Sequence, residues 1–304
     1  MAKLLLLVNP VAGRGKALKA LPRVEKTLRD MGLDYDLART TAPDDATNMA
    51  REAAAAGYEI VACLGGDGTV SETGRGLIYT DTALALLPEG TGNDFARAVG
   101  VYHNLPKALR ALGEGNIQTI DVGRFGPHTF LNSVGVGFDG LVTHENQKVT
   151  RLTGILSYLV VVLKNLPTYR NPHFHLKARD WEFKSKGVLV EVGNGQCAGG
   201  GFFLTPHANL QDGLLDVTLL GDYGPVQRFV ALPVVLLKQM QMLKGVSMFK
   251  TDMLQIAVDR PTYIHVDGNL KHITEPATVE ILPLALKVVF PKGRERRPAP
   301  AVAP

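Results

Sequence analysis

Short apolar runs alternate with helix-like segments in the first third of the chain. Four such runs predict β-strands, namely residues 3–8, 35–38, 60–64 and 83–87. Between them, apolar residues recur at helical spacing from Leu18 to Leu28, and an alanine-rich segment follows Asp44 and Asp45. Because strands alternate with helices, this part predicts a parallel sheet covered by helices.

The pattern changes after about residue 121. Short β-rich runs separated by turn residues now dominate, at residues 128–133, 173–178, 187–192, 214–219, 253–258, 263–266, 277–282 and 287–290. Two helical segments, 152–166 and 225–243, interrupt them. We therefore predict an α/β nucleotide-binding domain with a parallel sheet, followed by a mainly antiparallel β-sandwich domain. The expected ranges are 1–122 and 123–290, with a tail at 291–304 that is either loose or returns to the first domain.

The turn after the predicted strand 60–64 organises the chain. It contains Gly65, Gly66, Asp67, Gly68 and Thr69, followed by the expected start of a helix. Glycines allow the backbone to approach a ligand closely, and amides at a helix N-terminus suit a phosphate. A carboxylate repels a phosphate unless a divalent cation lies between them, which favours a magnesium nucleotide. The alternative is a tight turn in which Asp67 only caps the helix.

Two more glycine-bearing turns, 9–16 and 88–97, follow other predicted strands. The turn 9–16 also carries basic groups, but it is neither a Walker A loop nor a complete dinucleotide fingerprint. We expect it to contact a phosphate; a connector loop is the alternative. In parallel sheets, ligands bind beyond the carboxyl ends of the strands. We therefore expect the three turns to converge on one ligand.

Composition limits the partners and the compartment. The chain has 304 residues and a formal net charge of +4, and several of its basic residues lie in the run 292–297. This mild charge predicts no nucleic-acid partner and a weak attraction to anionic lipids. Cys63 and Cys197 are the only cysteines, which favours free thiols in a reducing compartment. The apolar stretches 155–163 and 229–237 are too short to span a bilayer.

The two glycine motifs together resemble those of a known family. Residues 65–72 and 88–97 are similar to the catalytic motifs of bacterial diacylglycerol kinases and related lipid kinases, with sphingosine and ceramide kinases as more distant relatives. Matching positions in the second part of the chain lie at 194–195, 199–201, 206, 208, 212–217 and 266–268. The resemblance covers nearly the whole chain in order.

The resemblance implies an active cleft between the two domains, with ATP and Mg²⁺ as cofactors. The residues implied in nucleotide binding are Asn9, Pro10, Gly13, Thr40, Gly65, Gly66, Asp67, Gly68, Thr69, Glu72, Gly90, Thr91, Asn93 and Asp94. For Asn93 and Asp94 the alternative is simple capping of the next helix. A structural Mg²⁺ site is implied at Asp212, with the carbonyls of Asn209 and Leu214; a plain turn is the alternative.

The chain departs from the family at the catalytic base. The resemblance places a glutamate directly after the Asp267-Gly268 pair, where this chain has Asn269. An amide cannot accept a proton as a general base. Either Asp67 or Asp267 replaces the glutamate, or the enzyme is slow, or the protein binds its ligands without turnover. We expect His265 and His272 to be ordinary strand or surface residues.

The predicted function is transfer of the ATP γ-phosphoryl group to a lipid hydroxyl, diacylglycerol being the expected acceptor. The alternatives are an NAD kinase or sugar-phosphate kinase, a sphingoid-base kinase, or a catalytically weakened nucleotide- and lipid-binding protein. Segments 152–166 and 225–243 could line a lipid pocket, or they could be core helices. We expect a cytoplasmic protein, peripheral to the inner face of the membrane, that meets its lipid substrate there; a homodimer is possible.

Overall fold

The chain divides into two compact units. The computed structural model describes residues 3–149, 152 and 154–293. Unit 1 consists of Met1–Asp121 and Pro283–Pro304, and unit 2 of Val122–Leu282. The second unit therefore ends earlier than the expected residue 290, because the last strand continues into the sheet of unit 1. Most of the expected tail, residues 294–304, lies outside the described residues.

Unit 1 is built on a parallel sheet. Its strands are β1 (Leu4–Val8), β2 (Tyr35–Arg39), β3 (Ile60–Gly65) and β4 (Ala83–Pro88). They lie in the order β2-β1-β3-β4, and Val288 of β15 pairs with Leu84 at the β4 edge. All residues of β1, β3 and β4 are buried. This explains their continuous apolar sequence, which is typical of strands covered on both faces.

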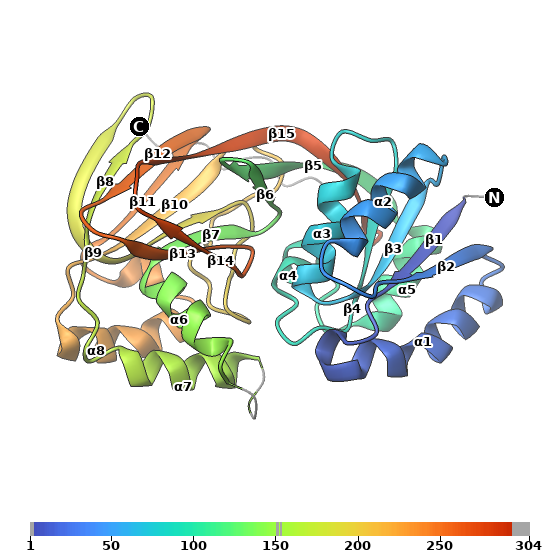
Figure 1. The fold of residues 1–304 in the computed structure, drawn as a ribbon, viewed down its shortest axis with the longest axis horizontal. Coiled ribbons are helices and arrows are strands. Elements are labelled where there is room, and N and C mark those ends of the chain that lie inside the picture. Colours follow the sequence, from blue (N-terminus) through green and yellow to red (C-terminus); the bar gives the residue numbers. More distant parts are fainter. Residues whose placement is uncertain (1–2, 150–151, 153, 294–304) are drawn as a thin grey trace. The chain divides into compact units, whose positions relative to one another are not determined.

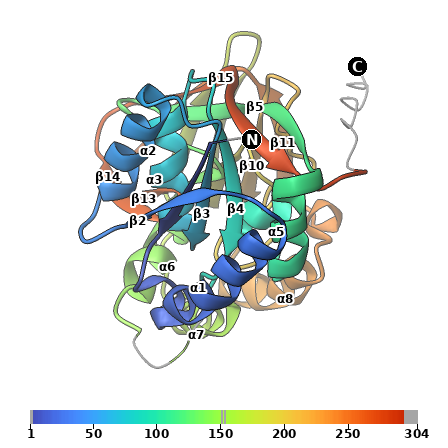
Figure 2. The ribbon, with the colours of Figure 1, turned by 90° about the vertical axis from the view of Figure 1, so that its right-hand side faces the viewer.

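Helices cover both faces of this sheet, with α2 and α3 on one side and α1 and α5 on the other (Figures 1 and 2). The helices of unit 1 are α1 (Ala12–Asp30), α2 (Asp45–Ala55), α3 (Asp67–Leu77), α4 (Asp94–Val99) and α5 (Leu105–Glu114). Helix α1 buries Leu21, Val24 and Leu28, as its sequence predicts, but at the first turn of this face it buries Ala17, and Leu18 is exposed. The fold class expected for this part of the chain is confirmed.

Unit 2 is a β-sandwich of mainly antiparallel strands. Its strands are β6 (His128–Phe130), β7 (Ser133–Gly137), β8 (His173–Lys177), β9 (Glu182–Gly193), β10 (Leu215–Gly221), β11 (Val246–Thr251), β12 (Met253–Val258), β13 (Thr262–Val266) and β14 (Asn269–Ile273). Strand β5 (Asn116–Phe125) crosses the unit boundary after Asp121, and strand β15 (Ala277–Phe290) crosses the one after Leu282. The expected sandwich architecture is confirmed.

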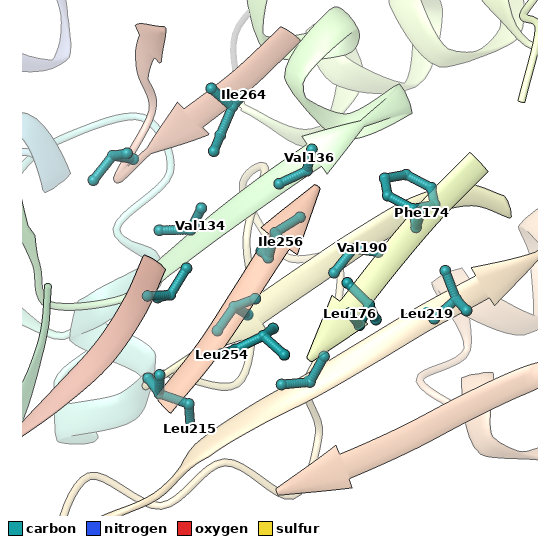
Figure 3. Close-up of a cluster of buried hydrophobic side chains, with 14 of the residues drawn as sticks. Val134, Val136, Phe174, Leu176, Val190, Leu215, Leu219, Leu254, Ile256 and Ile264 are labelled. Carbon is teal, nitrogen blue, oxygen red and sulfur yellow. The ribbon is translucent and has the colours of Figure 1, made fainter. Parts of the chain in front are cut away.

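The long strand β9 joins the two layers of the sandwich. Its first half pairs with β8, and its second half pairs with β7 and β10. Buried side chains from both layers meet between them, including Val134, Phe174, Val190 and Ile256 (Figure 3). This apolar core holds β7, β9 and β13 in fixed register.

Among the described residues of unit 2, three helices and a short 3₁₀ turn, η1 (Met240–Met242), complete the fold. The helices are α6 (Phe138–Asn146), α7 (Ile155–Asn165) and α8 (Pro225–Leu236). The predicted helix 225–243 is too long, because α8 ends at Leu236 and Lys238 has a left-handed backbone with a φ of 63°. Helix α6 was not predicted. In the part of the chain that the structure describes, no helix is long and apolar enough to cross a bilayer.

Helices α2 and α3 pack closely at Gly76. A Cβ atom added there would lie 2.4 Å from the carbonyl oxygen of Thr47 and 2.8 Å from the Cβ of Ala50. The hydroxyl of Thr47 also donates to the carbonyl of Glu72, at 3.0 Å. The absence of a side chain at Gly76 therefore lets α3 approach α2, and this packing supports the helix that begins at Asp67.

The change Gly76→Ala should lower the free energy of unfolding by about 1–3 kcal/mol, the usual cost of overpacking. Gly68→Ala is the matched control, because a Cβ at that position meets nothing within 4 Å. Its effect should be neutral, or stabilising by up to about 1 kcal/mol through helix propensity. Urea denaturation measures both. Equal stability of Gly76→Ala and the unmodified chain would contradict the packing described here.

Candidate functional site

The register of the sheet aligns the ends of β1, β2, β3 and β4. Val8 pairs with both Arg39 and Leu64, and Gly65 pairs with Pro88. The ladder continues one residue into the turns, since Asn9 N–H donates to the carbonyl of Leu64 and Glu89 N–H to that of Gly65, at 3.1 and 2.9 Å. The structure thus brings together the three glycine-bearing turns that the sequence singles out.

The turn after β1 is tied to the turn after β3 by Asn9. Its amide nitrogen donates to the hydroxyl of Thr69 at 2.9 Å, and its side-chain oxygen accepts from Val11 N–H at 3.1 Å. Pro10 and Gly13 follow in the same turn. Gly13, Arg14 and Gly15 have left-handed backbone conformations, so the regular part of α1 begins at Lys16.

Three glycines allow the turns to touch. A Cβ atom on Gly13 would lie 2.0 Å from the carbonyl oxygen of Glu89, and one on Gly90 would lie 2.4 Å from the Cα of Gly66. Gly13 also has a φ of 59°, which favours glycine. Side chains at these positions would separate the turns, so the contact requires glycine.

The turn after β3 presents the N-terminus of α3. Gly66 is the N-cap residue and supplies no side-chain hydrogen bond, while Gly68 is exposed and Gly65 is buried. Asp67 is half-buried, and its Oδ1 accepts from the N–H of Phe95 at 3.2 Å. The first turn of α3 therefore combines backbone amides, which suit an anion, with a partly exposed carboxylate.

The turn after β4 is held by Asn93. Its side-chain oxygen accepts from Gly90 N–H at 2.9 Å, its amide nitrogen donates to the Gly90 carbonyl at 3.0 Å, and it is 2% exposed. Asp94 is also buried, with Oδ1 3.5 Å from Nε of Arg97. Thr91 is exposed. Asn93 and Asp94 thus shape the turn, whereas Thr91 is open to a ligand.

Thr40 and Glu72 border these turns. The N–H of Thr40 donates to the carbonyl of Val8 at 3.0 Å, directly beside the turn after β1. Glu72 lies in α3, and burial raises the pKa of its carboxyl, with the N–H of Asp44 opposing this effect. Both residues lie on elements that adjoin the glycine turns.

Basic side chains near the turns were not assigned a role from the sequence. Burial lowers the pKa of His103, and the neighbouring charges of Arg97 and Lys16 lower it further. The guanidinium of Arg97 lies 3.3 Å from the ring centroid of Tyr102. A cationic group near a phosphate site would add to the attraction of the amides. In the sequence, the only feature that could have drawn attention to Lys16, Arg97 and His103 was their position close to the glycine motifs.

In unit 2, Asp267 is engaged with the backbone. Asp267 and Gly268 form a two-residue hairpin turn with φ values of 47° and 79°, as in a type I′ turn. The carboxylate accepts from the N–H groups of Leu131, Asn132 and Ser133 at 2.8–3.0 Å. These bonds fix the hairpin to the start of β7. The geometry gives Asp267 a structural role in place of the catalytic role that we considered for it.

Asn269 occupies the position of the expected base. It pairs with Val266 at the start of β14, and it is exposed. The hairpin therefore presents an amide where the resemblance implies a carboxylate.

The implied structural metal site contains a lysine. The ammonium of Lys250 donates to Asp212 at 2.8 Å and to Asp216 at 2.9 Å. The other oxygen of Asp212 accepts from Leu214 N–H at 3.2 Å, and the side chain of Asn209 accepts from Gln211 N–H. As these groups lie, they do not fit the implied Mg²⁺ ion, because the ammonium of Lys250 already binds both carboxylates and offsets one of their two negative charges.

A buried cluster of Asp139, Glu191 and His265 was not predicted. Burial and the nearby Asp139 raise the pKa of Glu191 to about 8. Burial alone would lower the pKa of His265, but the carboxylate of Asp139, which is hydrogen-bonded to its Nε2, outweighs this effect and raises the pKa to about 9. His265 is thus no ordinary strand histidine. The three residues of the cluster lie far apart in the sequence. They come together only because β7 pairs with both β9 and β13.

An apolar cavity of about 70 Å³ lies among the helices of unit 2. Its wall includes Val142 of α6, Tyr158 and Val162 of α7, and Leu232 and Val235 of α8. The two helical segments that we considered for a lipid pocket therefore do line an apolar space. They are also core helices, since Val162 and Val235 belong to a buried cluster.

Comparison with protein families agrees with the fold and the turns. Residues 3–125 match the diacylglycerol kinase catalytic domain, and residues 132–290 match the YegS C-terminal NAD kinase beta sandwich-like domain. The chain therefore belongs to the diacylglycerol kinase family of lipid kinases.

Individual relatives are similar over much of the chain. A "Probable lipid kinase YegS-like" of Xanthomonas euvesicatoria pv. vesicatoria (strain 85-10) is 31% identical, over 87% of this chain and 89% of that protein. One from Pseudomonas putida KT2440 is 37% identical over 64% of this chain, but the match spans only 66% of that protein. A solved structure of a diacylglycerol kinase candidate from Bacillus anthracis str. Sterne is 26% identical with a TM-score of 0.79, covering 95% of this chain and 97% of that one.

Replacing Asp267 with alanine should lower the free energy of unfolding by about 2–4 kcal/mol, because backbone donors lose a charged acceptor. His272→Ala is the control on the same hairpin; His272 is exposed, so the change should cost less than about 0.5 kcal/mol. Denaturant unfolding without ligands measures both. If Asp267→Ala kept full stability but lost phosphoryl transfer, a catalytic role would replace the structural one.

Proposed function

We propose that the protein is an ATP-dependent kinase that transfers the γ-phosphoryl group to a lipid hydroxyl, diacylglycerol being the preferred acceptor. The observation that carries this proposal is the contact of three glycine turns around the N-terminus of α3, with Asp67 among them. Family membership supports the reaction class. ATP and Mg²⁺ are part of the proposal.

In this proposal each group in unit 1 has a defined task. The amides at Gly66 and Gly68 bind the triphosphate, and the hydroxyls of Thr69 and Thr91 donate to it. Asp67 orients Mg²⁺, directly or through water, and the ion offsets the charge of the phosphates. Asn9 positions Thr69 through the hydrogen bond between their side chains.

The acceptor side of the proposal rests on α7 and α8. Besides lining the apolar cavity, these helices expose large apolar side chains, including Leu156 and Val160 on α7 and Val226 and Val230 on α8. Leu156 is 60% and Val226 is 76% exposed. Apolar patches of this kind mark contacts with partners or membranes. We place the reaction at the cytoplasmic face of a membrane, where the acceptor's acyl chains are available.

The absence of the expected base favours a second candidate function. With Asn269 as an amide and Asp267 bonded to three backbone amides, Asp67 is the remaining carboxylate of those that we considered as the base. Positioning and metal charge supply much of phosphoryl transfer, so a slow kinase is consistent with this site. A protein that binds nucleotide and lipid without turnover is the alternative.

Asp67→Asn should reduce label transfer from ATP to diacylglycerol by at least ~100-fold, since it removes the charge that holds the cation. The change keeps an oxygen that can accept from Phe95 N–H. The assay uses the full chain, labelled ATP, Mg²⁺ and diacylglycerol in mixed micelles. Asp81→Asn, at an exposed aspartate paired with Lys287, should leave the rate unchanged. Wild-type transfer by Asp67→Asn would remove Asp67 from the mechanism.

Asn269→Glu should raise the transfer rate about tenfold or more, because general-base assistance is typically worth about 10²–10⁴-fold. Asn269→Gln is the matched control: it has the same length as glutamate but cannot accept a proton, and it should not raise the rate. Rates are measured in the same micelle assay. Identical rates for Asn269→Glu and wild type would show that another group already acts as the base.

A further inference from the structure

Strand register places Glu191 and His265 on either side of one glycine. Gly135 of β7 pairs with Glu191 of β9 on one side and with His265 of β13 on the other. Cross-strand neighbours share a face of the sheet, so the two side chains lie beside each other. Asp139, in the first turn of α6 directly after β7, completes the group.

The donor atoms of the three side chains converge over Gly135. A Cβ atom on Gly135 would lie 2.3 Å from Oδ2 of Asp139, 2.4 Å from Nε2 of His265 and 2.6 Å from Oε2 of Glu191. One ligand atom from each residue lies within 4.8 Å of the other two. The missing side chain of Gly135 is what allows this convergence.

Glu191 is poorly satisfied by hydrogen bonds. It is 0% exposed, neither of its carboxylate oxygens has a hydrogen-bond partner of good geometry among the described residues, and its interactions with Ser133 and Asp139 are weak. A buried polar group without a partner is rare and calls for an explanation, such as a bound ion. One oxygen of the Glu191 carboxylate lies within 4.8 Å of the ligand atoms of Asp139 and His265, so a single ion could contact all three.

We propose that Asp139, Glu191 and His265 form a binding site for a divalent transition-metal ion in the sandwich of unit 2. One imidazole and two carboxylates suit Zn²⁺ or Mn²⁺, whereas Mg²⁺ prefers oxygen ligands alone. The raised pKa values leave protons on Glu191 and His265, and an incoming ion displaces them to solvent. The charge of two carboxylates then equals that of one divalent cation, so the loaded site is neutral. The site is distinct from the Asp212 region, where Lys250 supplies the positive charge.

A metal here would join three elements around the hairpin. It would link α6 and β9 to β13, and β13 ends at Val266, directly before the Asp267-Gly268 turn. The hairpin that presents Asn269 would then be held by the ion as well as by Asp267. This inference concerns unit 2 alone and does not depend on the proposed kinase activity.

The test begins with metal retention by the full chain. The protein is stripped with a chelator, dialysed against Zn²⁺, Mn²⁺ or Mg²⁺, desalted and analysed by mass spectrometry of its metal content. The wild-type chain should retain one Zn²⁺ or Mn²⁺ ion and no Mg²⁺, and its Tm should rise with either transition metal. Failure to retain a transition metal would overturn the proposal.

Two variants locate the ion. Glu191→Gln keeps the size of the side chain and should weaken Zn²⁺ binding at least ~10-fold. His175→Gln removes an exposed histidine that contacts Glu182 at 2.7 Å, and it should bind Zn²⁺ as the wild type does. Unchanged binding by Glu191→Gln, or loss of binding by His175→Gln, would overturn the assignment.

A measurement on the wild-type chain covers the case in which Glu191→Gln does not fold. Crystals soaked in Zn²⁺ should give an anomalous scattering peak between Asp139, Glu191 and His265. A peak only at surface histidines, or none, would show that the cluster is a hydrogen-bonded network without metal.

Discussion

The sheet of unit 1 depends on a steric constraint at the carboxyl ends of its strands. Gly66 and Gly90 approach so closely that a Cβ atom on Gly90 would lie 2.4 Å from the Cα of Gly66, and Gly13 meets Glu89 in the same way. Parallel register brings these positions level, and glycine removes the atoms that would separate them. As a result, the backbone amides of these turns and Asp67 lie together at the carboxyl ends of the strands.

Several polar residues near the two candidate sites hold the backbone. Asn93 bonds both the N–H and the carbonyl of Gly90, and the carboxylate of Asp267 accepts from three consecutive amides. Such bonds satisfy buried backbone groups that would otherwise be costly. Their side chains therefore act by positioning the turns. In the proposed kinase, ligand contact would fall to Asp67 and Thr91, which are not buried, and to the hydroxyl of Thr69.

The sequence was most informative where structure is local. Apolar runs predict β1, β3 and β4, because strands covered on both faces must be apolar throughout. Glycines likewise mark the turns that follow these strands, because the close approach of two turns requires residues without a Cβ atom. The exit of β15 into unit 1 was not predictable in this way, since it depends on contacts between residues far apart in the sequence, such as the pairing of Val288 with Leu84 and the bond from Tyr79 N–H to the carbonyl of Ala285. The pairing of Lys250 with Asp212 and the Asp139 cluster likewise depend on register between distant strands. The assignment of individual residues to nucleotide binding stays a prediction.

Hydrogen–deuterium exchange with and without MgATP tests the central claim most directly. If the three turns bind one triphosphate, amide exchange should slow together in peptides that contain residues 9–16, 65–72 and 88–95 of the full chain, and the effect should need Mg²⁺. Exchange that is unchanged in all three turns at saturating MgATP, or that slows in only one of them, would contradict a shared phosphate site.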